Sequence, residues 1–322
     1  MHDFPKPVVV VSKCLGFAHC RYNGQTIPDH FVEQLRDYVE YRPVCPEVEI
    51  GLGIPRDPVR IVIDEGKRLL YQPATGKDAT DSMQQFNDRF LQSVGQVDGF
   101  ILKNRSPSCG PWDVKVYSGM KKEAAVSRGS GFFGGEVLGR FPEQPIEDEG
   151  RLRNFTIREH FLTRLFALTR FRLMKADRSM RMLVEFHSRH KYLLMAYNQA
   201  QLKLLGAIVA NHEKRGIDEL LSLYEIHFTR ALVHAPRFKS MINVLHHAYG
   251  GVAKKLQSEE KRFFLNSVEE YRDERIPLSA LLRVLEAWSI GQGNRYLLDQ
   301  VLLRPYPLEL VEITDSGKGR KY

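Results

Sequence analysis

Apolar positions in residues 1–145 follow two alternating patterns. Short apolar runs bounded by turn residues are typical of buried strands, and apolar residues recurring every three or four positions are typical of helices. The runs predict strands at Val8–Ser12, Tyr41–Val44, Arg60–Asp64, Arg68–Tyr71 and Gly99–Lys103, and the spaced segments predict helices at Phe31–Tyr41 and Asp81–Val94. Such alternation is typical of an α/β domain with a mainly parallel sheet.

Residues after 145 follow the helical pattern alone. Glycine and proline are frequent in segment 129–150, so we expect no regular element there. We interpret the acidic run Glu147–Glu149 as a linker and expect a domain boundary near 145–155. Helices are then predicted at Ile157–Lys175, Asp177–Met182, His190–Gly206, Ile217–Ala231, Arg237–Leu256, Ser258–Glu274 and Leu278–Gln292. The sequence therefore predicts an α/β domain over residues 1–145 followed by an all-α domain over residues 146–322.

The hydrophobic residues are those of a soluble globular protein. They make up 43% of the chain, and no uninterrupted apolar stretch approaches the 18 residues that a membrane span needs. The apolar run Pro7–Val11 lacks a basic leader and a small-residue cleavage site, so we interpret it as a buried strand rather than a signal peptide. We expect a cytoplasmic protein with no membrane partner; its oligomeric state is left open.

Charge is concentrated in one part of the chain. Residues 1–145 carry 18 basic and 18 acidic side chains, whereas residues 146–322 carry 29 and 21. Within the second half, segment 151–192 holds eleven basic residues and three acidic ones, an excess as large as that of the whole protein. Such a basic segment favours a polyanionic partner, most often nucleic acid, although a solvated basic helix face has the same composition.

The four cysteines lie within the first 109 residues, at positions 14, 20, 45 and 109. Cys14 and Cys45 directly follow predicted strands, and Cys109 lies in the loop that follows a third. Ligands bind where loops leave the carboxyl ends of parallel strands, so these three loops could meet at one edge of the sheet. No pair has the close spacing of a zinc site. The pattern is compatible with a metal or cluster and equally with structural or redox thiols.

The surroundings of the cysteines resemble a known family. The motifs are Ser12–Gly16 with Cys20–Gly24, Val44–Glu47, Gly51–Arg56 and Ser106–Gly110. In this order they resemble the bacterial thiouracil desulfidase domain, over roughly residues 5–145. The remaining chain, with His187–Met195, is similar to a helical domain often fused to it. The fused form is similar to bacterial enzymes that convert 4-thiouridine in tRNA to uridine.

The resemblance implies a [4Fe–4S] cluster held by Cys14, Cys45 and Cys109, with one iron left open and Cys20 as a non-ligand. The open iron would bind the substrate sulfur as a Lewis acid while water replaces it at the ring carbon, without net redox change. Glu47 is the expected base and Ser106 the expected orienting or proton-relaying residue. Glu49 is the alternative base, because it would share a strand face with Glu47. Ser108 is expected to cap its loop.

The resemblance also implies tRNA as the substrate. The basic residues expected to contact the RNA backbone are Arg158, Arg164, Arg170, Arg172, Arg178, Arg181, Arg189 and Lys191. His187 and His190 are expected to contact phosphate or to be ordinary surface residues. Two alternatives stay open: a desulfidase acting on a free thiolated base or nucleoside, and an iron–sulfur RNA-binding or sensor protein without turnover.

Overall fold

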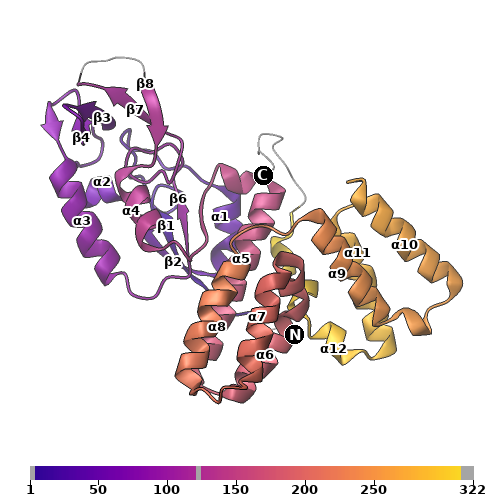
Figure 1. Ribbon diagram of the computed structural model, residues 1–322. Coiled ribbons are helices and arrows are strands. Elements are labelled where there is room, and N and C mark those ends of the chain that lie inside the picture. The colour runs from indigo at the N-terminus through magenta and orange to yellow at the C-terminus, as the bar shows by residue number, and fades with distance from the viewer. Residues whose placement is uncertain (1–3, 121–124, 313–322) are drawn as a thin grey trace. The chain divides into compact units, whose positions relative to one another are not determined.

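The computed structural model describes residues 4–120 and 125–312, which form two compact units (Figure 1). The first unit contains the residues up to Thr169 together with those from Pro307 onward, and the second contains Arg170–Tyr306. Helix α5, Phe155–Ala176, begins in the first unit and ends in the second. The predicted fold class is confirmed, because an α/β region is followed by a region of mainly helices.

A four-stranded parallel sheet lies at the centre of the first unit. Its strands are β1 (Val8–Ser12), β2 (Glu40–Val44), β6 (Gly99–Leu102) and β9 (Ile146–Asp148), in the order β2-β1-β6-β9. All three strand pairings are parallel, and every residue of β1 and β6 is buried. The carboxyl ends of β2, β1 and β6 therefore lie next to one another at one edge of the sheet.

A second sheet with mostly antiparallel pairing packs in the same unit. It contains β3 (Arg60–Asp64), β4 (Lys67–Gln72), β5 (Lys77–Asp78), β7 (Val114–Ser118) and β8 (Ala125–Gly129), in the order β5-β4-β3-β7-β8. The predicted hairpin is confirmed as the antiparallel pair β3–β4. Strands β7 and β8 were not predicted, because β8 has no buried residue and β7 buries only Val114 and Val116.

The helices of the first unit are short apart from α3 and α5. They are α1 (His30–Leu35), a 3₁₀ turn (Arg36–Tyr38), α2 (Pro46–Glu49), α3 (Thr80–Ser93), α4 (Phe132–Arg140) and two further 3₁₀ turns (Arg151–Arg153 and Leu308–Leu310). The predicted helix Phe31–Tyr41 is too long, because the chain tightens into the 3₁₀ turn and enters β2 at Glu40.

Two expectations for residues 129–150 are wrong: the segment has regular structure, and the acidic run Glu147–Glu149 is not a linker. Helix α4 and strand β9 occupy this segment, and the carboxylate of Asp148 accepts hydrogen bonds from the indole of Trp112 and the backbone of Arg151. The glycines of α4 allow close packing, since a Cβ on Gly134 would lie 2.5 Å from the carbonyl oxygens of Cys109 and Gly110. Glycine here permits a helix to approach a loop backbone rather than ending the helix.

Two glycines of α4 provide a matched test of this packing. Gly134→Ala should destabilise the protein by about 1–3 kcal/mol, because the new methyl group would clash with backbone atoms, which cannot move aside as the end of a flexible side chain can. Gly139→Ala should be neutral or stabilising by up to about 1 kcal/mol, because no atom lies within 4 Å and alanine favours the helix. Urea unfolding of both variants measures the difference, and equal midpoints would contradict the packing role.

The second unit consists of helices. They are α6 (Met180–Tyr197), α7 (Gln199–Ala210), α8 (Ile217–Ala231), α9 (Phe238–Gly250), α10 (Ser258–Arg272), α11 (Leu278–Gln292), α12 (Arg295–Leu298) and the 3₁₀ turns Ala253–Lys255 and Val301–Leu303. The predicted gap between residues 182 and 190 is wrong, since α6 runs through it. The break lies at Asn198, whose side chain accepts a hydrogen bond from the backbone N–H of Gln201 and caps α7.

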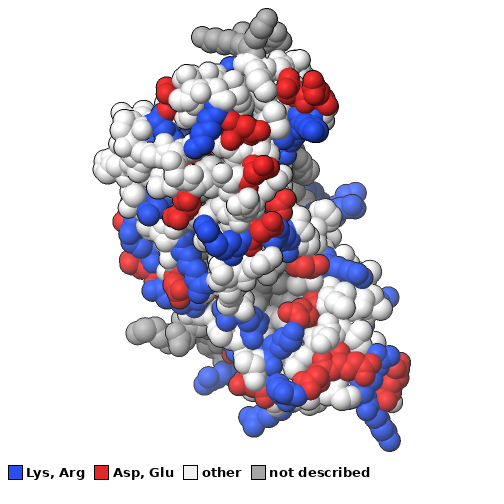
Figure 2. Space-filling model, turned by 90° about the vertical axis from the view of Figure 1, so that its left-hand side faces the viewer, with Lys and Arg blue, Asp and Glu red and all other residues white. Residues whose placement is uncertain are grey.

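Charged side chains of both signs intermix on the face drawn in Figure 2. Many of the arginines pair with neighbouring carboxylates, as Arg140 does with Asp88 and Glu136. Within the described residues, none of the helices is both long and apolar enough to cross a membrane.

Candidate functional site

All four cysteines line one cavity of about 350 Å³ in the first unit. Cys14 follows β1, Cys45 follows β2, and Cys109 lies in the loop after β6. Cys20 lies further along the loop that begins after β1. Cys20, Cys45 and Cys109 are buried and Cys14 is half-buried. The expectation that these loops converge at one edge of the parallel sheet is confirmed.

Hydrogen bonds between the loops hold this edge together. The backbone N–H of Lys13 donates to the carbonyl of Val44 at 2.8 Å, which fixes the start of the Cys14 loop beside the end of β2. The backbone N–H of Lys103 donates to the hydroxyl of Ser12 at 2.8 Å, which fixes the end of β6 beside β1. The three cysteine-bearing loops therefore leave the sheet in a fixed mutual arrangement.

The thiols affect one another's acidity. A hydrogen bond with the Cys14 thiol raises the pKa of Cys20, although a second one with Cys45 acts in the opposite direction. A hydrogen bond with the Cys20 thiol, together with burial, raises the pKa of Cys45. Burial, followed by the charge of Cys45, raises the pKa of Cys109. The cavity therefore gathers sulfur donors whose ionised forms need a cation to stabilise them.

Thiolates are the donors that iron–sulfur clusters use, and metal binding removes the thiol protons. The chemistry of the donor set therefore fits such a cluster. Within residues 4–120 and 125–312, no three cysteine, histidine or carboxylate side chains are already grouped as a metal site. All four thiols share one cavity.

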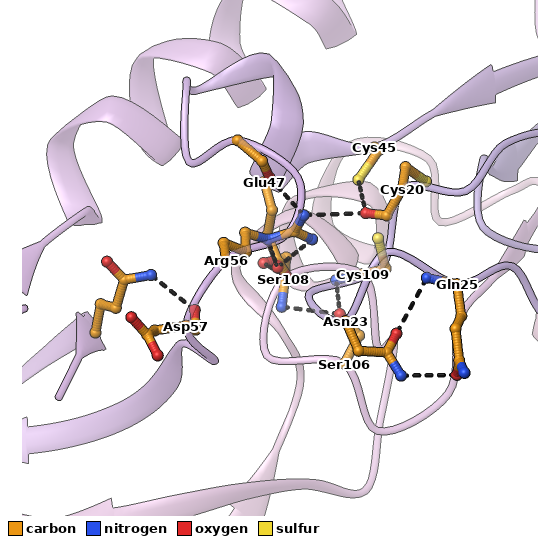
Figure 3. Close-up of polar contacts among 12 residues, drawn as sticks. Cys20, Asn23, Gln25, Cys45, Glu47, Arg56, Asp57, Ser106, Ser108 and Cys109 are labelled. Carbon is orange, nitrogen blue, oxygen red and sulfur yellow. Dashed lines mark hydrogen bonds and ion pairs between the residues drawn. The ribbon is translucent and has the colours of Figure 1, made fainter. Parts of the chain in front are cut away.

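Glu47 lies in the wall of the same cavity, on the single-turn helix α2. Its Oε2 accepts a hydrogen bond from Nε of Arg56 at 2.9 Å and forms an ion pair with Nη2 of the same residue at 2.7 Å. Its Oε1 accepts a hydrogen bond from the hydroxyl of Ser108 at 2.9 Å (Figure 3). The side chain of Glu47 is 12% exposed and that of Arg56 is 3% exposed. Both oxygens of the carboxylate are therefore held while its edge stays accessible from the cavity.

The alternative base, Glu49, lies outside this wall. The prediction that Glu47 and Glu49 share one face of a strand is wrong, because Pro46 begins a helical turn after β2. A helix turns neighbouring positions away from one another where a strand aligns every second residue. Glu49 is exposed and does not line the cavity. Proline at the first helical position was the signal that could have identified this turn.

The two serines of the Ser106–Gly110 motif make different contacts. Ser106 lines the cavity, and its hydroxyl accepts hydrogen bonds from the backbone N–H groups of Ser108 at 3.3 Å and Cys109 at 3.0 Å. Ser106 therefore caps the turn that carries Cys109. Ser108, which was expected to cap the loop, is fully buried and contacts Glu47 instead.

Lys103 and Arg105 also line the cavity. Lys103 forms an ion pair with Glu149, whose second oxygen accepts the backbone N–H of Asn104 at 2.8 Å. Arg105 has a φ of +55° and a largely exposed side chain, 3.6 Å from the carboxylate of Asp113. Glu149 thus contacts two residues of the cavity wall, Lys103 and Asn104, although its acidic surroundings in the sequence predicted a linker.

The basic residues predicted to contact RNA fall into two groups. Arg158 is 4% exposed and donates to the carbonyls of Leu152 and Glu312. Arg164 and Arg170 donate to the carbonyls of Glu143 at 3.1 Å and Pro305 at 2.7 Å. These three side chains have structural contacts within their own units, and Arg172 is half-buried. The exposed residues are Arg178, Arg181, Arg189 and Lys191.

His190 is not a surface residue. It is 2% exposed, and its ring stacks on Phe186 with the ring centres 3.8 Å apart. Burial, with the charge of Arg170 as the second cause, lowers the pKa of His190 to about 3. His187 is half-buried and shares a hydrogen bond of 3.0 Å with the hydroxyl of Tyr224. The phosphate contact predicted for His190 is therefore wrong.

Acid should destabilise the second unit through His190. Arg170, Arg189 and His187 face the ring and oppose its protonation. Because the folded pKa of about 3 lies below the ordinary value, the unfolded chain binds this proton first, and stability falls from about pH 6.5 to pH 3. The expected slope from this group is about 1.4 kcal/mol per pH unit. Urea unfolding should show a shallower pH dependence in His190→Gln, and an unchanged slope would contradict the assignment.

Comparison with known proteins gives matches for both regions. Residues 9–149 match the family model described as 2-thiouracil desulfurase, and residues 191–307 match a family described as protein of unknown function, DUF1722. The chain is similar to the uncharacterized protein YbbK of Bacillus subtilis (strain 168), with 32% identity over 110 residues covering 32% of this chain and 73% of YbbK.

Two further proteins are similar to the chain. The uncharacterized protein YbgA of Escherichia coli (strain K12) is 29% identical over 151 residues, which cover 44% of this chain and 89% of YbgA. The solved structure of the [4Fe–4S]-dependent thiouracil desulfidase TudS aligns at 26% identity with a TM-score of 0.36, covering 46% of this chain and 93% of TudS.

Proposed function

We propose that this chain, which belongs to the 2-thiouracil desulfurase family through residues 9–149, is an iron–sulfur desulfidase that converts 4-thiouridine in tRNA to uridine. One observation supports the proposal above the others. Four thiols and a held carboxylate line a single cavity where loops leave the parallel sheet. Ligand sites occupy this position in open α/β sheets.

Cys14, Cys45 and Cys109 are the proposed ligands of a [4Fe–4S] cluster, because each comes from a loop after one of three adjacent strands. The loop that carries Cys20 has another use, since the carbonyl of Cys20 accepts from Arg56 at 3.0 Å and from the Cys45 thiol at 3.7 Å. When bound, such a cluster supplies a Lewis-acidic iron with one position open for the sulfur of the substrate.

Glu47 would take a proton from the water that replaces sulfur. The overall reaction exchanges a ring C=S bond and water for a C=O bond and hydrogen sulfide, so it needs no oxidant or reductant. Ser108 and Arg56 keep the carboxylate in a fixed orientation. A general base needs such an orientation to lie within hydrogen-bond reach of the water. Ser106 holds the turn of Cys109 and has its hydroxyl at the cavity, where it can orient the substrate or relay a proton.

The tRNA part of the proposal depends on the exposed basic residues at the start of the second unit. Arg178, Arg181, Arg189 and Lys191 lie within fourteen residues of one another on α6 and the turn before it. Arg178 and Arg189 each have a carboxylate partner that phosphate could replace, Asp218 and Glu185. Contacts of this kind set the affinity and its salt dependence without reading the base sequence.

The test measures desulfidation by the anaerobically purified chain. Thiolated tRNA, free 4-thiouracil and free 2-thiouracil are each incubated with it, and sulfide release is followed. Turnover of tRNA at a higher kcat/KM than either base supports the proposal. Turnover of the free bases alone would overturn the tRNA substrate. A chain that binds iron and RNA without any turnover would be the non-catalytic protein instead.

A charge-matched pair of variants isolates RNA binding. In one, Arg178, Arg181, Arg189 and Lys191 are replaced by Gln; in the other, four exposed basic residues elsewhere in the second unit are replaced, namely Lys214, Lys239, Lys254 and Arg262. The first variant should bind tRNA more weakly, and its salt slope should fall by about 1 for each phosphate that it no longer neutralises. Equally weakened binding in the two variants would mean that net charge, rather than this surface, attracts the RNA.

A further inference from the structure

Arg56 lines the cavity and contacts three other residues of its wall, Glu47, Cys20 and Tyr22. Its Nε donates to Oε2 of Glu47, with which Nη2 forms an ion pair. Its Nη1 donates to the carbonyls of Cys20 and Gly53, each at 3.0 Å. Figure 3 shows its guanidinium between Glu47 and Cys20. The backbone N–H of Arg56 donates to the carbonyl of Tyr22 at 2.8 Å. One residue therefore joins three separate segments of the chain.

This arrangement requires a guanidinium. Burying a cation is costly unless it is paired and its other donors are satisfied, and Arg56 meets both conditions with only 3% of its side chain exposed. The rigid planar fork presents donors toward the carboxylate and toward the carbonyls at the same time, whereas a lysine ammonium is a point charge on a flexible stem. Lysine at this position would keep the charge and lose the fixed geometry.

The contacts also explain how Glu47 is oriented. Arg56 holds Oε2 and Ser108 holds Oε1, so rotation of the carboxylate would break hydrogen bonds at both oxygens. Through Nη1 the same guanidinium fixes the loop that carries Cys20. The carboxylate and the cysteine loop thus cannot move independently of each other.

We propose that Arg56 is a positioning residue that holds the Glu47 carboxylate in register with the Cys20 loop. Its effect on turnover rests on the proposed function, because that effect requires Glu47 to act on water or substrate. The hydrogen bonds by which Arg56 holds the Cys20 loop, called the clamp below, are a property of the chain itself. They can therefore be tested whether or not desulfidation occurs.

A double-mutant cycle tests the effect on turnover. Arg56→Lys, Glu47→Gln and the combined variant are compared, with Arg42→Lys as the matched control. Arg42 is an arginine of the same unit that donates to two backbone carbonyls, those of Val94 and Gln96, away from the cavity. Iron content is measured for each protein, so that loss of a cluster is not mistaken for loss of positioning.

We expect Arg56→Lys to lower kcat about 10- to 100-fold, with KM changed less than about threefold and iron content preserved. In the Glu47→Gln background the same substitution should cost less than about twofold, because the residue on which it acts is already neutral. Arg42→Lys should retain the wild-type kcat. Multiplicative losses in the combined variant, or an unchanged kcat in Arg56→Lys, would overturn the proposal.

Hydrogen exchange on the full chain as purified gives a readout that does not depend on activity. The backbone N–H groups of Arg21 and Ile27 donate within the loop, to the carbonyls of Gln25 and Cys14. In Arg56→Lys these amides should exchange at least about tenfold faster, because the loop can then open locally without first breaking the hydrogen bonds of the arginine. In Arg42→Lys their exchange rates should not change. A wild-type chain without desulfidase activity would refute the proposed function alone, whereas unchanged exchange would refute the clamp.

Discussion

Cys45→Ala is expected to yield a chain that purifies without iron and releases no sulfide from thiolated substrates. Cys45 is buried where β2 ends, beside β1 and the Cys14 loop, and its removal would take away one of the three proposed ligands. Cys109→Ala should have the same effect, since its loop approaches the cavity from the other side of β1. Anaerobic iron and sulfide analysis measures the outcome, and a [4Fe–4S] cluster would give about four of each per wild-type chain.

Cys20→Ala is the matched control for this prediction. Cys20 lines the same cavity and is as buried as Cys45 and Cys109, so its substitution removes a comparable amount of packing. It should keep its iron, because the bonds with Arg56 and with the Cys45 thiol use its backbone carbonyl, which alanine retains. If Cys20→Ala loses the iron and Cys14→Ala keeps it, the choice of ligands is wrong. Zinc, or no metal, in the wild-type chain would refute the cluster itself.

Glu47→Gln is expected to lower kcat about 10²- to 10⁴-fold, the range that a general base contributes. The amide is isosteric with the carboxylate and can still accept a hydrogen bond from Arg56 or Ser108, so the fold and the iron content should persist. Single-turnover measurements on thiolated substrate separate the loss of chemistry from slow product release.

Glu49→Gln is the control for that substitution. Glu49 shares helix α2 and also lies near the end of β2, yet it is exposed outside the cavity. It should retain the wild-type kcat. A large loss in Glu49→Gln with normal turnover in Glu47→Gln would show that the base had been assigned to the wrong carboxylate.

The convergence of the cysteines could be predicted from the sequence because it follows from topology. Three apolar runs predicted strands, parallel pairing brings their carboxyl ends to one edge, and the cysteines follow those ends. The contacts around Glu47 could not be predicted in this way. Arg56 and Ser108 reach it from loops that no periodic pattern describes, and only the folded chain shows which serine of the motif meets the carboxylate.

The errors in segment 129–150 have a related cause. Glycine weakens helices in isolation, yet Gly134 occurs in α4 because its missing side chain admits the backbone of the Cys109 loop. The acidic residues there resemble a solvated linker by composition alone, although Asp148 and Glu149 are buried with hydrogen-bonded partners. Whether a charge is solvated or buried with a partner depends on residues distant in sequence.

The interrupted first unit has a consequence for synthesis on the ribosome. Residues from Pro307 return to it: Leu310 is buried, and Arg158 donates to the carbonyl of Glu312. The intervening Arg170–Tyr306 must be translated before this segment emerges. At roughly 5–20 residues per second the delay is about 7 to 27 seconds. The nascent first unit must therefore persist through that interval without the segment that begins at Pro307, and the helices of the second unit can fold in the meantime.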